Sequence, residues 1–95
     1  MFEVKQPGKK IKTVLNDLGS DYEIKVIDAE QCIYRNLNNG YDIEVSGLNN
    51  QRKSFEARVY VWNTKDGTRI VERNTDIASF EELKKTLDDL SIKYS

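Results

Sequence analysis

The sequence contains no histidine and a single cysteine, Cys32. Histidine is the side chain that most often serves as a general acid, a general base or a metal ligand near neutral pH. A nucleophilic cysteine in turn needs an activating base or cation beside it. We therefore expect no catalytic residue, no metal and no cofactor, and we interpret Cys32 as a small, partly buried apolar side chain.

Several sequence motifs are also missing. The chain has no P-loop, no G-x-S-x-G and no dinucleotide-binding glycine pattern. No segment approaches the ~20 apolar residues that span a bilayer, and residues 1–5 lack the apolar stretch of a signal peptide. Because one cysteine cannot form a disulfide within the chain, the sequence favours a reducing compartment. We expect a cytoplasmic protein without a membrane partner.

The charges are nearly balanced. Fifteen Lys and Arg residues oppose 16 Asp and Glu residues, for a net charge of −1. Such a chain has no overall field that would draw it to nucleic acid or to an anionic membrane. A length of 95 residues with 38% hydrophobic side chains is typical of one domain, so we predict a single compact domain over residues 1–95.

Two segments near the ends of the chain have helical periodicity. The first follows Pro7-Gly8 and ends at Gly19, a residue that readily adopts the left-handed conformation of a helix C-terminus. The second begins with Ser79 and Glu82, which match the S-x-x-E capping box. The apolar residues at helical spacing are Ile11, Val14, Leu15 and Leu18 in the first segment and Phe80, Leu83, Leu87 and Leu90 in the second.

Between these segments the hydrophobic period changes to two, which is typical of half-buried strands. The alternation predicts strands over residues 22–26, 31–37, 41–45, 54–62 and 69–73, and an additional early strand is considered at residues 2–5. Short glycine-containing loops at residues 38–40 and 65–67 favour antiparallel hairpins.

These elements predict an α+β fold. We expect a two-layer sandwich in which an antiparallel meander of about five strands lies between an N-terminal and a C-terminal helix, in the order α-β-β-β-β-β-α. Both helices are expected on the same face of the sheet. That face carries Phe55, Ala57, Val59 and Val61.

The opposite face of residues 54–62 carries Arg58, Tyr60 and Trp62. If the following hairpin continues as a regular ladder, these side chains lie beside Arg69 and Arg73, and Trp62 is exposed to solvent. Tryptophan, tyrosine and arginine are enriched among the residues that dominate binding energy at protein interfaces. The candidate partner-binding residues are Tyr34, Arg58, Tyr60, Trp62, Arg69 and Arg73.

Asp42 and Glu44 lie two residues apart and project from one face of their strand. Paired carboxylates can perform acid–base glycoside chemistry, but that chemistry needs a cleft and a desolvated acid. We expect instead a solvated pair that meets arginines on the next strand.

The sequence therefore favours a non-catalytic protein-binding module that uses the aromatic and arginine face. An adaptor or an inhibitor, including one of phage or mobile-element type, fits the general character of such a small acidic chain. A single-stranded nucleic-acid-binding domain that uses the same face is the alternative, because aromatics can stack bases and arginines can contact phosphates. A small hydrolase that uses Asp42 and Glu44 is the third hypothesis. We also consider self-association of the chain through the aromatic and arginine face.

Overall fold

The computed structural model describes residues 9–27, 29–48, 55–65 and 67–95. Its elements, in chain order, are α1 (Lys9–Leu18), β1 (Glu23–Ile27), β2 (Glu30–Asn36), β3 (Tyr41–Ser46), β4 (Ala57–Asn63), β5 (Arg69–Ile77) and α2 (Phe80–Lys93). The strands form one sheet in the order β1-β2-β3-β4-β5, and each neighbouring pair is antiparallel. The predicted fold class and element order are confirmed. The additional strand considered at residues 2–5 lies outside the described residues.

The meander is closed by tight turns at positions where the backbone needs unusual dihedral angles. Asn38 and Gly40 both have positive φ between β2 and β3, at 61° and 92°. Glycine adopts such angles without steric cost, and asparagine tolerates them better than most other residues. The Gly40 carbonyl also accepts a bond of 2.8 Å from the Thr64 backbone N–H, which ties this turn to the end of β4.

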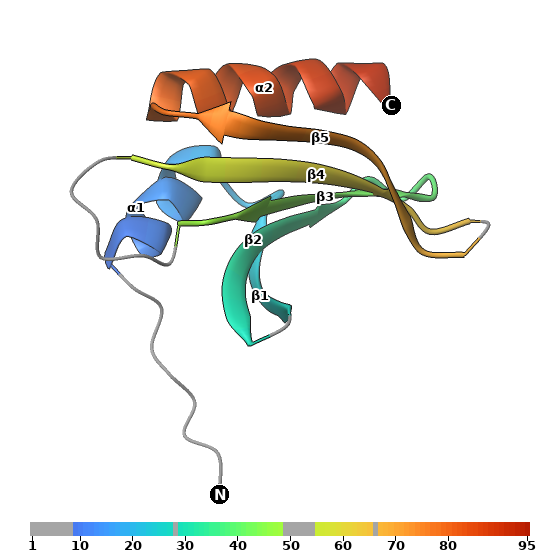
Figure 1. Ribbon diagram of the computed structural model, residues 1–95, viewed down its shortest axis with the longest axis horizontal. Helices are drawn as coiled ribbons and strands as arrows, with labels where there is room; N and C mark the ends of the chain where they lie inside the picture. The colour runs from blue at the N-terminus through green and yellow to red at the C-terminus, as the bar shows by residue number, and fades with distance from the viewer. Residues whose placement is uncertain (1–8, 28, 49–54, 66) are drawn as a thin grey trace, which may run out of the picture.

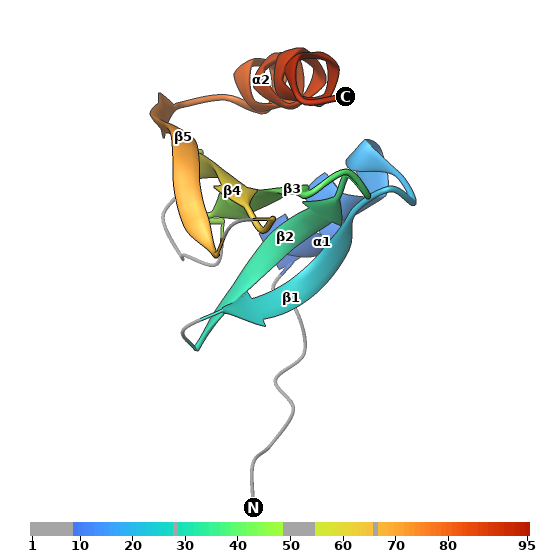
Figure 2. The same ribbon diagram turned by 90° about the vertical axis from the view of Figure 1, so that its right-hand side faces the viewer.

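Both helices pack on the same face of the sheet. Figure 1 shows α2 running along β5, and Figure 2 shows α1 behind β1 and β2. The core is one cluster of buried apolar side chains from both helices and from alternate strand positions. Its members include Ile11 and Val14 of α1, Leu83, Leu87 and Leu90 of α2, and Ile33, Ile43, Val45, Ala57, Val59 and Val61 of the strands.

The helix ends follow the sequence signals. Gly19 has a φ of 94°, and its N–H donates to the Leu15 carbonyl just after α1. Ser79 caps α2, because its hydroxyl oxygen accepts a bond of 3.1 Å from the Glu82 N–H. The Glu82 carboxylate in turn accepts from the Ala78 N–H at 3.0 Å. No helix within the described ranges is long and apolar enough to cross a membrane.

Candidate partner-binding face

The side of the sheet turned away from both helices, here called the helix-free face, collects most of the predicted site residues. Directly opposed residues of an antiparallel sheet point to the same side. The register pairs Tyr34 with Glu44, Glu44 with Tyr60, and Tyr60 with Arg73. One row across four strands therefore contains Tyr34, Glu44, Tyr60 and Arg73.

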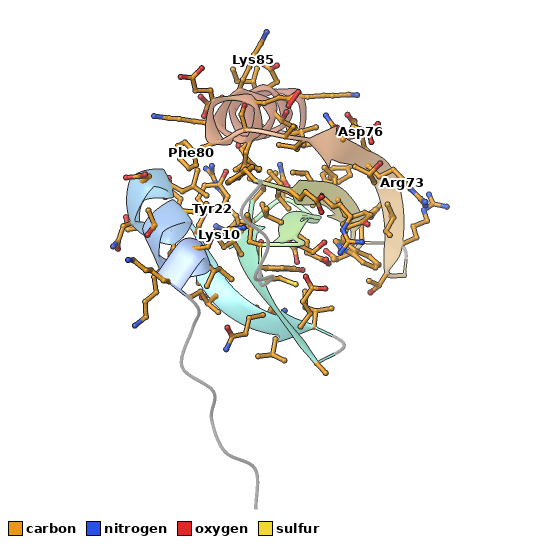
Figure 3. All side chains as sticks on the ribbon, turned by 60° about the vertical axis from the view of Figure 1, so that its left-hand side comes forward. Lys10, Tyr22, Arg73, Asp76, Phe80 and Lys85 are labelled. Atoms are coloured by element: carbon orange, nitrogen blue, oxygen red, sulfur yellow. The ribbon has the colours of Figure 1, made fainter. Side chains whose placement is uncertain are left out.

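Two predicted positions on this face agree with the structure. Tyr34 lies on the helix-free face, and Arg73 lies directly opposite Tyr60. Figure 3 shows Arg73 at the outer edge of the sheet on β5, with its side chain directed away from the helices. Arg58 and Arg73 are exposed, whereas Tyr60 is half-buried.

The regular ladder assumed between β4 and β5 is wrong near the turn. Val61 pairs with Glu72 but Trp62 pairs with Ile70, so Val71 is an extra residue in β5. A β-bulge of this kind reverses the side-chain alternation beyond it. Arg69 consequently lies opposite Asn63, on the helix side of the sheet, rather than beside Trp62. The structure does not bring Arg69 together with the other candidate residues.

The expectation of a solvated acidic pair is also wrong. Asp42 is 9% exposed and Glu44 is 6% exposed, although both lie on the helix-free face. The residues opposite them on β4 are Trp62 and Tyr60, not arginines. The carboxylates therefore lie among aromatic side chains, where an ionised group needs hydrogen-bond donors to offset its lost hydration.

Aromatic side chains supply some of those donors. The indole N–H of Trp62 donates to Glu44 Oε1 at 3.0 Å, and the Tyr34 hydroxyl donates to Asp42 Oδ2. The Cys32 thiol lies 4.0 Å from Glu44 Oε2, at the limit for a weak sulfur donor. Because hydrogen bonds to charged acceptors are stronger than neutral ones, the Trp62 and Tyr34 side chains are held in fixed orientations.

The Tyr34 ring is restrained on a second side. The Lys25 ammonium of β1 lies 4.2 Å from the ring centroid, which is cation–π geometry. Burial, followed by the hydrogen bond to Asp42, raises the pKa of Tyr34 well above its usual value. Tyr34 therefore stays protonated, and continues to donate, throughout the physiological pH range.

Trp62 was expected to be exposed, but it is half-buried. Its indole N–H donates to the Glu44 carboxylate of the neighbouring strand, so the side chain does not extend freely into solvent. Trp62 is nevertheless absent from the core between the sheet and the helices. The assignment of the two strand faces is therefore confirmed, while the degree of exposure is corrected.

The hydrolase hypothesis concerns Asp42 and Glu44, and the structure shows how this pair lies relative to the surface grooves. Among the surface grooves lined by described residues, one lies between β4 and the end of β5, and another lies between α1, Phe55 and Phe80. Neither groove includes Asp42 or Glu44. No group of three or more potential metal ligands occurs among the described residues. The acidic pair is desolvated, as a catalytic acid requires, and its carboxylates accept hydrogen bonds from the Tyr34 hydroxyl and the Trp62 indole.

A second polar cluster, which the sequence did not indicate, joins β5 to α2. Glu72 Oε1 accepts bonds of 2.7 Å from both the Lys93 ammonium and the Tyr94 hydroxyl. These bonds lower the pKa of Glu72, the Lys93 bond most. Burial and the bond to Glu72 raise the pKa of Tyr94 to about 12.

The raised pKa of Tyr94 predicts a loss of stability at alkaline pH. The stabilisation from a tyrosine with a raised pKa is fully present below its unfolded-state pKa of about 10. It is lost as the pH rises through the folded-state value of about 12. Urea unfolding across this pH window is expected to show a smaller decline for Tyr94→Phe than for the wild type. Identical declines would contradict the role assigned to Tyr94.

Comparisons of the chain with models of protein families, with curated proteins and with solved structures found no match.

Proposed function

We propose that this chain is a non-catalytic protein-binding module, an adaptor or an inhibitor, and that the helix-free face is its partner surface. The observation that carries the proposal is the anchoring of Trp62 and Tyr34 by the buried carboxylates Glu44 and Asp42. Both aromatic side chains are fixed in the free domain, yet both retain part of their surface for a partner.

Fixed aromatic rings suit this task for a physical reason. Binding normally costs side-chain entropy at each residue that becomes immobile, and a side chain that is already held loses less. Tryptophan, tyrosine and arginine dominate many interfaces because they bury large areas and also offer polar groups. Here the exposed Arg58 and Arg73 lie on the same side of the sheet as the aromatics and supply the polar contacts.

A single-stranded nucleic acid is the second candidate, and the combination of aromatics with Arg58 and Arg73 supports it. Two features favour a protein instead. The carboxylates of Asp42 and Glu44 lie at the centre of the face, where they would repel a phosphate backbone. The chain as a whole also carries a net charge of −1. Because the sequence has only one cysteine, we propose the cytoplasm as the location.

The experiment compares the wild type with two alanine variants. Trp62→Ala removes the aromatic side chain that donates to Glu44, and Lys85→Ala is the control on the outer side of α2, where Figure 3 shows Lys85 pointing away from the sheet. Each protein is immobilised and exposed to lysate of the native host. A retained protein is then purified and titrated against all three, at low and at high salt.

We expect the wild type and Lys85→Ala to retain one protein that Trp62→Ala does not retain. The affinity of the wild type for this protein is expected to persist at high salt. A parallel titration with single-stranded DNA and RNA uses the fluorescence of Trp62, the only tryptophan in the chain. Binding to these oligonucleotides with a steep salt dependence, together with no Trp62-dependent protein, would replace the proposal with the nucleic-acid alternative.

A further inference from the structure

The two edges of the sheet differ in how well they resist pairing with another strand. Edge strands expose unpaired backbone groups, and β-bulges are one of the devices that prevent pairing. The ladder of β5 shifts register twice against β4. In contrast, β1 pairs with β2 without interruption from Glu23 to Ile27. The edge formed by β1 therefore has no bulge to protect it.

An exposed apolar side chain marks the same edge. Val26 is 65% exposed and is one of three large hydrophobic side chains that are exposed in the part of the chain that the structure describes. It lies on the helix side of β1, yet the main strand contact of α1 is with β2, one strand further in. Within the described part of the chain, no helix or strand runs along the open edge of β1 (Figures 1 and 2).

The backbone of β1 is also correctly phased for an additional strand. The hairpin closes at the pair Ile27–Glu30. Hydrogen-bonded and non-hydrogen-bonded pairs alternate along an antiparallel ladder, starting with a bonded pair at a two-residue turn. Ile27, Lys25 and Glu23 therefore direct their backbone groups to β2. Ile24 and Val26 direct theirs to the open edge.

We propose that β1 pairs antiparallel with β1 of a second copy of this chain, with Ile24 at the two-fold axis. In this register Glu23 of each copy lies opposite Lys25 of the other, in non-hydrogen-bonded pairs where side chains approach most closely. Tyr22, which precedes β1 and whose backbone N–H donates to the Gly19 carbonyl at 3.4 Å, lies opposite Val26 of the other copy and covers the exposed valine. The proposal does not depend on the function proposed for the helix-free face.

Charge selects this register over its neighbours. Moving the axis to Lys25 places that residue opposite itself, and moving it to Glu23 does the same for the carboxylate. Moving it to Val26 leaves Lys25 opposite Ile27 and Glu23 opposite Ala29, so no ion pair forms. Like charges directly opposite one another destabilise a sheet, whereas opposite charges stabilise it. Only the axis at Ile24 matches both the charges and the outward backbone groups.

The self-association is tested by sedimentation equilibrium of the whole chain from micromolar to millimolar concentration. Pairing of two short strands buries little area, so a weak, concentration-dependent dimer is expected. Val26→Lys is expected to raise the dimer dissociation constant about tenfold or more, because it removes an apolar contact with Tyr22 of the other copy and because a lysine on an edge strand opposes pairing with another chain. The matched control is Val71→Lys, a change at another exposed valine on the opposite edge.

A charge exchange supplies a test that depends on register. Glu23→Lys alone creates two like-charge pairs and is expected to weaken the dimer. Adding Lys25→Glu restores two opposite-charge pairs and is expected to recover it. A wild type that stays monomeric at millimolar concentration would overturn the proposal, as would a dimer that survives Val26→Lys or a double variant that does not recover. Loss of the dimer in Val71→Lys or Trp62→Ala would assign the contact to β5 or to the helix-free face instead.

Discussion

Replacing Val59 with aspartate is expected to abolish cooperative folding. Val59 is fully buried at the centre of β4, opposite Val45 and within the cluster shared by both helices. An unpaired carboxylate in such a site costs several kcal/mol, while a domain of this kind has only about 5–15 kcal/mol of total stability. Thermal unfolding followed by circular dichroism is expected to lose its sigmoidal transition.

The matched control is Val71→Asp, which places the same side chain at an exposed valine of the neighbouring strand. This variant is expected to keep a cooperative transition. A normal transition in Val59→Asp would mean that the sheet face bearing Val59 is not the face covered by the helices, and the two-layer arrangement would be wrong.

The second large effect is expected from replacing Trp62 and Tyr60 together with serine. The loss of both side chains is expected to weaken partner binding by more than about 2 kcal/mol, or about 30-fold in the dissociation constant. Folding is expected to persist with reduced stability, because neither residue belongs to the core cluster but the buried Glu44 carboxylate loses the Trp62 donor. Calorimetric titration of the partner recovered by the wild type measures the loss.

The control for this variant is Lys85→Ala on the outer side of α2, which is expected to bind the partner with unchanged affinity. The unfolding transition of each protein is recorded beforehand, so that a binding loss is separated from a folding defect. Equal affinity of the wild type and the double serine variant for the partner would mean that the partner does not bind the helix-free face.

Local signals in the sequence predicted most of the fold. The spacing of Ile11 and Val14 gave the first helix, and the Ser79 capping box placed the start of the second. Strict alternation at residues 57–62 assigned the two faces of β4 correctly. These features depend on the periods of 3.6 residues in helices and two residues in strands, which can be recognised in the sequence without knowledge of the tertiary structure.

The predictions that proved wrong concern features that are set by contacts between neighbouring strands. The bulge at Val71 depends on how β5 meets β4 after their turn, and alternation within β5 alone does not reveal it. The burial of Asp42 and Glu44 depends on Tyr34 and Trp62, which come from the strands on either side. A carboxylate beside alternating apolar residues is typical of a solvent-facing position, so the sequence pattern favoured solvation.

The central claim is that a partner binds the helix-free face, where buried carboxylates fix the aromatic side chains. Its most direct test is ¹H–¹⁵N NMR of the labelled chain during titration with the recovered partner. Because the chain has one tryptophan, the indole N–H of Trp62 gives a single resonance on this face. If the partner binds this face, large shifts are expected for that resonance and for backbone amides around Tyr34, Tyr60 and Arg73. Shifts confined to α1 and α2, with the Trp62 indole resonance unmoved at saturation, would contradict binding at the helix-free face.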